Sequence, residues 1–138
     1  MFDANEVING LYGFVYDENG KQMQETKAFE ANVDYDKEEV LQAGKLMKGH
    51  KVIAASGAGT ITAHKSDSRL QRKAADNPHA KYNFSAKLKD PTSKGEEYIM
   101  FIGVSFDSAQ LMNFELGELG EIEMDFTFDD FKYLKSIN

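Results

Sequence analysis

The chain has 138 residues, no cysteine and a formal net charge of −7 at pH 7. This length predicts a single domain, residues 1–138, which buries about two-thirds of its unfolded surface around one core. The absence of cysteine excludes disulfides, thiolate catalysis and the common zinc frameworks, and it fits synthesis in a reducing cytoplasm. The negative charge argues against tight or sequence-specific nucleic-acid binding and against docking on an anionic membrane.

Two features predict that the protein has no membrane anchor and no secretion signal. No apolar run approaches the roughly 20 residues that a spanning helix needs. The N-terminal run MFDANEVING lacks the basic and apolar regions of a signal peptide.

The first half of the chain begins with a turn. Asn19-Gly20 is the strongest hairpin signal in the sequence, because both turn positions favour positive φ. Residues 29–36 alternate between apolar and polar side chains, which predicts a half-buried strand. Residues 36–47 carry a weaker helical pattern, because Gly44 interrupts it.

The middle of the chain predicts a short helix and then a strand. In residues 66–78, Ser66 or Ser68 can cap the N-terminus of a helix, and Pro78 ends it. Residues 81–89 alternate between polar and apolar side chains, as a half-buried strand requires. Residues 90–97, DPTSKGEE, are typical of a turn.

The C-terminal part predicts two further strands. Residues 98–106 are apolar on both faces in their first half, which indicates a strand that is covered on both sides or meets another subunit. A turn at Gly117–Gly120 precedes an alternating strand over residues 121–129. Together the elements predict a mainly β fold: a β-barrel or β-sandwich of antiparallel strands with one short α-helix.

Residues 47–65, MKGHKVIAASGAGTITAHK, pose the question of a phosphate site. The run GAGTIT lacks the third glycine of a dinucleotide-binding fingerprint and leads into β-branched residues, not into a helix. Gly44-Lys45 does not form a phosphate-binding loop, because Leu46 follows where Ser or Thr is needed. No GxSxG element is present either. We therefore expect no enzyme activity and no cofactor.

The three histidines are the remaining candidates for metal ligation. His50, His64 and His79 are 14 and 15 positions apart, and these spacings match no compact ligand motif. Distant strands can bring such residues together, so a metal-dependent enzyme remains an alternative that predicts bound zinc. The favoured interpretation is three partly exposed histidines and no metal.

Several segments, taken in order, carry a family resemblance. They are KAFEANVDYDKEEV, GKLMKGHK, SGAGTITAHK and the C-terminal run VSFDSAQLMNFELGELGEIEMDFTFDDF. The chain resembles the tail tube protein of contractile phage tails, in the branch found in PBSX-like defective prophages. The resemblance covers roughly residues 10–133 of the sequence.

The resemblance implies a fold and a mechanical function. Such proteins have a β-barrel or sandwich with a helix on one side, and they are related to the tube protein of type VI secretion systems. Six copies close into a ring, rings stack into a hollow tube, and a contracting sheath drives the tube through a target envelope. The implied partners are further copies, the contractile sheath protein, the baseplate or tube initiator, the tape measure and the tail terminator. The implied locations are the bacterial cytoplasm for synthesis and a virion tail or a released tail-like particle afterwards.

The resemblance also implies where copies meet. In this family a long loop between early strands reaches toward neighbouring subunits, and residues 40–58 occupy that place. Residues 1–9 are expected to form a flexible N-terminal arm. Gly57 and Gly59 are expected to let strands pack closely, and a bulky residue at Gly49 or Gly57 is expected to leave a folded monomer that cannot polymerise. The predicted contact residues are Leu46, Met47, Gly49, His50, Lys51, Val52, Ile53, Gly57 and Gly59.

The acidic strand row Glu121, Glu123 and Asp125 has several interpretations. It can line the lumen, face the sheath, pair with lysines across strands or form an ordinary solvated face. The lysines considered for such pairs are Lys81, Lys87 and Lys89.

A competing function for the whole chain is a small β-barrel that binds a ligand inside. The phenylalanines that would crowd such an interior are Phe84, Phe106, Phe126 and Phe128.

Overall fold

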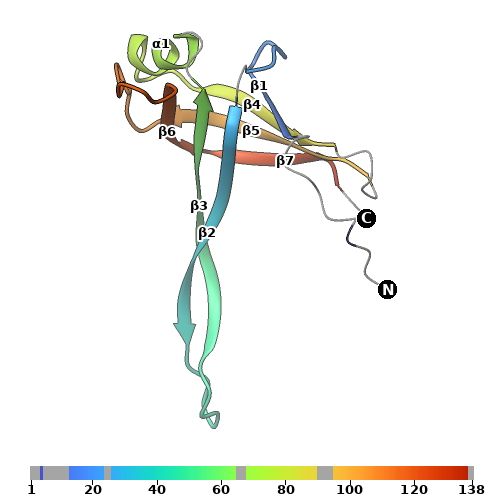
Figure 1. The fold of residues 1–138 in the computed structure, drawn as a ribbon. Helices are drawn as coiled ribbons and strands as arrows, with labels where there is room; N and C mark the ends of the chain where they lie inside the picture. Colours follow the sequence, from blue (N-terminus) through green and yellow to red (C-terminus); the bar gives the residue numbers. More distant parts are fainter. Residues whose placement is uncertain (1–3, 5–12, 24–25, 65–67, 90–94, 137–138) are drawn as a thin grey trace.

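The computed structural model describes residues 4, 13–23, 26–64, 68–89 and 95–136. The elements in chain order are β1 (Gly13–Tyr16), β2 (Thr26–Val40), β3 (Gly49–His64), α1 (Arg69–Asp76), β4 (Tyr82–Leu88), β5 (Glu97–Phe106), β6 (Glu121–Phe128) and β7 (Asp130–Lys135). The predicted fold class, mainly antiparallel β with one short α-helix, is confirmed (Figure 1). The predicted N-terminal arm, residues 1–9, lies outside the described residues except for Ala4.

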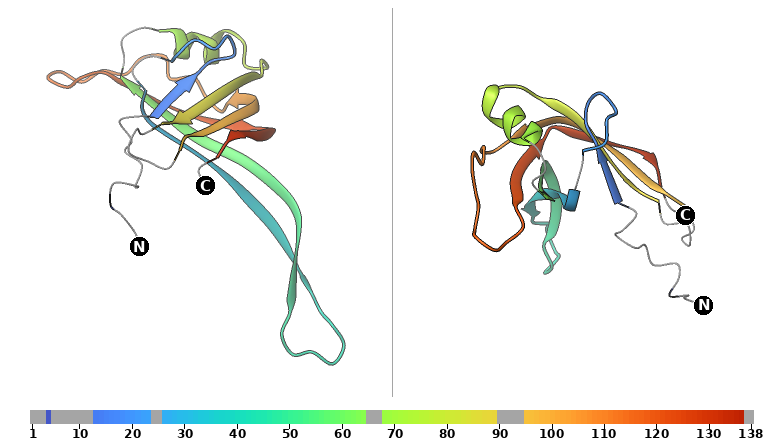
Figure 2. Two further views of the ribbon diagram at one scale, coloured as in Figure 1. Left: turned by 90° about the vertical axis from the view of Figure 1, so that its right-hand side faces the viewer. Right: turned by 45° about the horizontal axis from the view of Figure 1, so that its top comes forward.

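The strands form two layers that share β5. The strand order is β1-β4-β5-β6-β3-β2, every pairing is antiparallel, and β7 pairs with β5. The first half of β5 pairs with β7, and its last residues, Ser105 and Phe106, pair with β6. We call β1, β4, β5 and β7 the short-strand layer and β2, β3 and β6 the long-strand layer. Figures 1 and 2 show β2 and β3 running far beyond the rest of the molecule.

A glycine corner marks the point where β5 changes partner. Gly103 has φ +70°, and a Cβ atom there would lie 2.5 Å from Oδ2 of Asp129, the residue between β6 and β7. The N–H of Gly103 donates to Oδ1 of Asn83 (3.2 Å), and the N–H of Asp129 donates to the carbonyl of Ile102 (2.9 Å). Lys81 completes the corner with an ion pair to Asp129 at 2.6 Å. Only glycine tolerates both this φ and this close approach.

Aromatic rings fill the space between the two layers. Phe84 and Phe126 are each 1% exposed, and the Phe101 ring lies 5.6 Å from Phe29 and 5.1 Å from Phe128. These rings come from both layers, so their contacts hold the sandwich closed. The sequence-based expectation of an interior crowded by phenylalanine is confirmed, with Phe106 half-buried at its edge.

The helix predicted over residues 66–78 is confirmed as α1, and its buried residues Leu70 and Ala74 join the core. Ser68 stands at the N-cap but makes no side-chain capping bond. No helix among the described residues is long and apolar enough to cross a membrane.

The structure has turns at Asn19-Gly20 and at Gly117–Gly120, but the first does not join two paired strands as a hairpin signal predicts. β1 pairs with β4 and β2 with β3, and among the described residues the bridge between Tyr16 and Gln22 links the two sides of the turn. Gly20 has φ +76° and Gly117 has φ +87°, both in the left-handed region that glycine favours. The N–H of Gly20 donates to the carbonyl of Asp17 (3.0 Å), which closes the first turn. The turn predicted over residues 90–97 falls largely on residues 90–94, outside the described residues.

Two predictions for residues 36–58 are wrong. The segment 36–47 is not helical: β2 continues to Val40, and residues 41–48 connect the strands. The segment 40–58 is not a long loop, because β3 begins at Gly49 and pairs with β2 along its length. Backbone hydrogen bonds to the partner strand outweigh the weak helical preference of the local sequence.

A bulky residue at Gly57 should destabilise the fold. A Cβ atom on Gly57 would overlap the ring of Phe128, so Gly57→Val overpacks the core and should cost about 1–3 kcal/mol of unfolding free energy. The free energy is measured by urea denaturation of the monomer. Gly49→Val is the matched control, because a Cβ at Gly49 meets only the carbonyl of Val40 at 3.7 Å. Equal stability of the two variants would contradict this packing. That a bulky residue at Gly57 leaves a folded monomer that cannot polymerise remains a prediction.

Glu96 should make the stability of the short-strand layer depend on pH. A hydrogen bond from Lys135 at 2.7 Å, helped by Lys87 and Lys89 at 3.7 Å, lowers the pKa of this carboxyl below its usual value. A lowered folded-state pKa stabilises the protein above the unfolded-state pKa, and the benefit is lost as the pH falls through the folded-state pKa. Glu96→Gln should therefore melt below the wild type at pH 7 and converge with it under acid conditions. The exposed Glu115→Gln is the control and should melt like the wild type at both pH values.

Candidate assembly surfaces

The outer half of the β2–β3 hairpin projects from the body with no layer over it. The two strands pair from Thr26 and Ala63 at the body to Val40 and Gly49 at the far end. Every residue from Asp34 to Ser56 is exposed. At about 3.3 Å per residue, the uncovered part of the strands extends roughly 20 Å, before the connecting residues are counted. Figure 2 shows this arm leaving the compact part of the molecule.

The residues predicted to contact neighbouring copies mostly lie on this arm. At the tip, Leu46 is 98% exposed and Met47 is 76% exposed. On β3, Val52 is 50% exposed and Ile53 is 56% exposed. Gly49, His50 and Lys51 are exposed beside them. Exposed apolar side chains that lie together are typical of interaction surfaces, and contact of these residues with neighbouring copies remains a prediction.

Gly57 and Gly59 are placed differently from the other predicted contacts. A Cβ atom on Gly57 would overlap the ring of Phe128, and one on Gly59 would overlap the ring of Phe126 and the carbonyl of Glu30. The predicted close approach therefore occurs within the chain, where the β3 backbone lies against the β6 aromatic rings. A contact of these glycines with a neighbouring subunit remains a prediction.

Sequence reasoning missed further apolar residues on the arm. Leu41 is 77% exposed and Tyr35 60%, and both flank the predicted set. Lys48 bonds to Glu39 across the strands (3.1 Å), which helps hold the connection in shape. The apolar residues next to 46–53 were the available signal, but the helical interpretation of 36–47 obscured it.

The acidic row Glu121, Glu123 and Asp125 belongs to a larger acidic face. Thr60 lies opposite both Glu30 on β2 and Asp125 on β6, so these three side chains share one face of the long-strand layer. The Thr60 hydroxyl donates to Oδ1 of Asp125 (2.7 Å). The other face of β6 is buried in the core, which leaves this face uncovered. The carboxylates added by β2 are Glu30, Asp34, Asp36 and Glu38, and we call the whole set the acidic face.

The lysines considered as partners of the acidic row bind elsewhere. Lys81 pairs with Asp129, while Lys87 and Lys89 lie 3.7 Å from Glu96. Lys87 lies on β4, and Lys81 and Lys89 stand just outside its two ends; β4 belongs to the short-strand layer and does not adjoin β6. Within the acidic row, Glu121 forms an ion pair with Lys27 instead. The hydrogen bond from Lys27 lowers the pKa of the Glu121 carboxyl.

The structure separates two of the histidines. His50 and His64 stand at opposite ends of β3, and 14 positions at about 3.3 Å each place them about 46 Å apart. One metal ion cannot bind both. Across the part of the chain that the structure describes, no group of three or more His, Cys, Asp or Glu side chains is placed to hold a metal.

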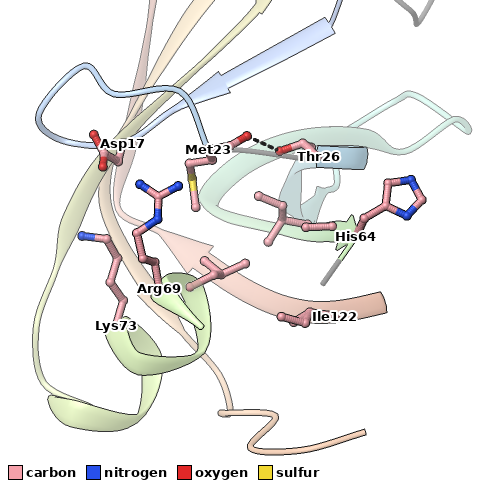
Figure 3. A pocket seen from close by; sticks show the side chains of 10 residues that line it. Asp17, Met23, Thr26, His64, Arg69, Lys73 and Ile122 are labelled. Atoms are coloured by element: carbon pink, nitrogen blue, oxygen red, sulfur yellow. Dashed lines mark hydrogen bonds between the residues drawn. The ribbon is translucent and has the colours of Figure 1, made fainter. Parts of the chain in front are cut away.

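A small cavity lies between α1 and the end of β3 (Figure 3). Its volume is ≈ 50 Å³, whereas small-molecule sites occupy about 300–1,000 Å³. Arg69 and Lys73 extend from α1, and Figure 3 shows the Arg69 side chain beside Met23, while Ile122 lies on the other side of the cavity. Lys73 is bound to Glu18 at 2.5 Å. This cavity is a packing defect beside the helix, too small for a ligand.

Comparison with known proteins agrees with a role in assembly. The sequence profile of the family described as "Phage tail tube protein" matches residues 1–135. The phage-like element PBSX protein XkdM of Bacillus subtilis (strain 168) is 35% identical over 136 residues, covering 93% of this chain and 90% of that protein.

Two solved structures show the same fold at low sequence identity. A chain of the sheath–tube complex of an extracellular contractile injection system (PVC, extended state) has a TM-score of 0.75 at 10% identity, covering 96% of this chain and 95% of that one. A chain of the six-fold symmetrised baseplate of the anti-feeding prophage has a TM-score of 0.60 at 9% identity, covering 88% and 90%. With the profile match and the XkdM identity, these findings show that the chain belongs to the phage tail tube protein family.

Proposed function

We propose that the chain is the structural subunit of the inner tube of a contractile tail, whether of a phage, a defective prophage or an R-type bacteriocin. Hexameric rings of the chain stack into a tube, and the sheath drives this tube through the envelope of the target cell. The observation that carries the proposal is the projecting arm with its exposed apolar side chains, in a member of the tail tube family. The proposed role is mechanical and needs no catalytic group.

Ring formation uses edges of the long-strand layer. A closed ring of identical chains requires two different surfaces that meet, with a rotation that returns to the start. Within the described pairings β2 bonds to β3 alone, so its other edge offers unpaired backbone groups along Thr26–Val40. A strand of the next copy can bond there, as sheet edges readily add strands. The structure of the anti-feeding prophage baseplate is six-fold symmetrised, which supports six copies.

Stacking of rings uses the arm. Leu46 and Met47 lie at its tip, farthest from the body, and are positioned to enter a neighbouring ring. His50, Lys51, Val52 and Ile53 follow on the same projecting strand. Burial of these side chains contributes roughly 25 cal/mol for each Å² of apolar surface removed from water.

The other partners follow from the place of such a tube in its particle. The chain is made in the bacterial cytoplasm and works in a virion tail or a released tail-like particle. Its partners are the sheath, the baseplate or tube initiator, the tape measure and the tail terminator. The sheath–tube complex that shares its fold supports the sheath contact.

The acidic face lines the lumen in this proposal. One face of the long-strand layer packs on the core, and the uncovered face carries carboxylates from β2 and β6 around the small residues of β3. A surface of one sign repels DNA and other acidic cargo, so a passing molecule does not stick to the wall.

Removal of the apolar tip should abolish stacking without unfolding the monomer. Leu46→Ser with Met47→Ser changes two exposed side chains, so the melting temperature should stay within a few degrees of the wild type. Negative-stain images of the concentrated variant with its cognate baseplate and sheath should show no tubes. Gln42→Ser in the same connection is the control and should assemble. Normal tubes from the double variant would refute the role of the arm, and a wild-type chain that stays monomeric would refute the proposed function.

The lumen assignment predicts size-dependent labelling. Ala58 lies at the centre of the acidic face, opposite Asn32 and Thr127, and the chain has no native cysteine. In Ala58→Cys, a small maleimide should label monomers and tubes alike, because it diffuses through the lumen. A maleimide on a large polymer should label only monomers, as read by gel shift. Labelling of intact tubes by the large reagent would place this face on the outside.

A further inference from the structure

A second apolar surface lies far from the arm, on the loop between β5 and β6. All residues from 111 to 120 are exposed. The large apolar side chains among them are Leu111 (72% exposed), Met112 (72%), Phe114 (76%), Leu116 (93%) and Leu119 (86%). Clustered exposed apolar side chains of this size mark an interaction site. We call residues 111–119 the apolar loop.

The base of the apolar loop is fixed to the body. Gln71, 5% exposed on α1, donates from Nε2 to the carbonyls of Gln110 (2.8 Å) and Leu111 (3.1 Å). The N–H of Glu123 donates to Oε1 of Gln110 at 3.3 Å. A buried amide that bonds two loop carbonyls holds the loop where it leaves the body, and such preorganisation lowers the entropy lost on binding.

The opposite edge of the molecule carries an apolar groove. β1 and β2 are the two ends of the strand order, and across the part of the chain that the structure describes no strand pairing closes the opening between them. The opening is a groove of ≈ 430 Å³. Apolar lining residues from both layers include Val15, Phe29, Ala31, Ala86, Ile99 and Phe101. The charged residues of its lining are Lys27, Lys87 and Glu97.

The loop and the groove cannot meet within one chain. The apolar loop leads into β6, while the groove lies beyond β3 at the free side of β2. Figure 1 and the right view of Figure 2 show the loop before β6 and strand β1 on opposite sides of the β2–β3 hairpin. A closed ring needs such an arrangement, in which one edge of a copy fits the other edge of the next.

We propose that the apolar loop of one copy inserts into the groove between β1 and β2 of the next copy in the ring. This inference rests on the proposed tube function and identifies the side-to-side contact, which is distinct from the arm that joins rings. The apolar side chains of the loop complete the open end of the sandwich core. The loop also carries two acidic residues, Glu115 and Glu118, which meet Lys27 and Lys87 at the groove. Lys27 already pairs with Glu121 and Lys87 with Glu96, so each lysine then contacts a second carboxylate.

Cysteine cross-linking tests the contact directly, because the native chain has no cysteine. Leu116→Cys places a thiol on the loop, and Ala86→Cys or Ala31→Cys places one in the groove. Tubes assembled from an equal mixture of a loop variant and a groove variant should give disulfide-linked dimers on mild oxidation. Their yield should exceed that of tubes from either variant alone by about tenfold. The double variant Leu116→Cys with Ala86→Cys should give a ladder of linked chains that ends at one ring.

Serine substitutions provide a second, independent measurement. Leu116→Ser with Leu119→Ser changes only exposed side chains, so the monomer should melt like the wild type while ring formation is lost at concentrations where the wild type assembles. Asn113→Ser in the same loop is the matched control and should form rings. Normal tubes from the double serine variant, or tubes whose mixed cross-links do not exceed the single-variant background, would overturn the loop–groove contact and leave the tube function standing. Failure of the wild type to form any ring would instead overturn the tube function.

Discussion

The antiparallel pairing of β2 and β3 continues beyond the part of these strands that packs on the core. Along its inner half, β3 lies against the aromatic rings of β6, and Gly57 and Gly59 make that approach possible by having no side chain. Beyond them the backbone hydrogen bonds continue, so the arm keeps its shape, but its apolar side chains have no cover within the chain. The proposed tube assembly would cover this surface with further copies of the chain.

The two-layer body depends on one corner. At Gly103, β5 leaves β7 and passes to β6, and Asn83, Asp129 and Lys81 hold the backbone at that point. The corner directs β6 and the long strands away from the short-strand layer. β6 in turn pairs with β3, which carries the arm together with β2.

Surfaces of different chemistry consequently lie on different sides of the molecule. Strand β2 contributes to three of these surfaces, since its carboxylates belong to the acidic face, its outer half to the arm and its residues Phe29 and Ala31 to the groove, while the apolar loop lies between β5 and β6. A subunit of a stacked ring needs such separation, because its neighbours to the side, its neighbours above and below and the interior of the tube each require a distinct surface. No enzymatic group is needed for any of these roles.

Local sequence determined much of this protein. Alternation placed the strands around residues 29–36, 81–89 and 121–129, a run that is apolar on both faces placed the strand at 98–106, and Asn19-Gly20 placed a turn. Side-chain period and turn conformation depend on near neighbours in the chain. The ordered segments also pointed to the family that the sequence profile shows. The exposed apolar residues at 46, 47, 52 and 53 were identified from the same resemblance.

Tertiary structure decided the features that depend on distant residues. Residues 36–47 have a locally helical composition, yet β2 extends to Val40 because β3 offers it a partner strand. Gly57 meets Phe128 from the other end of the chain, and Lys81 bonds Asp129 and not the acidic row. Neither the groove nor its position opposite the apolar loop has a local signature, since both arise only when the strand order brings β1 and β2 to the two ends of the sheet.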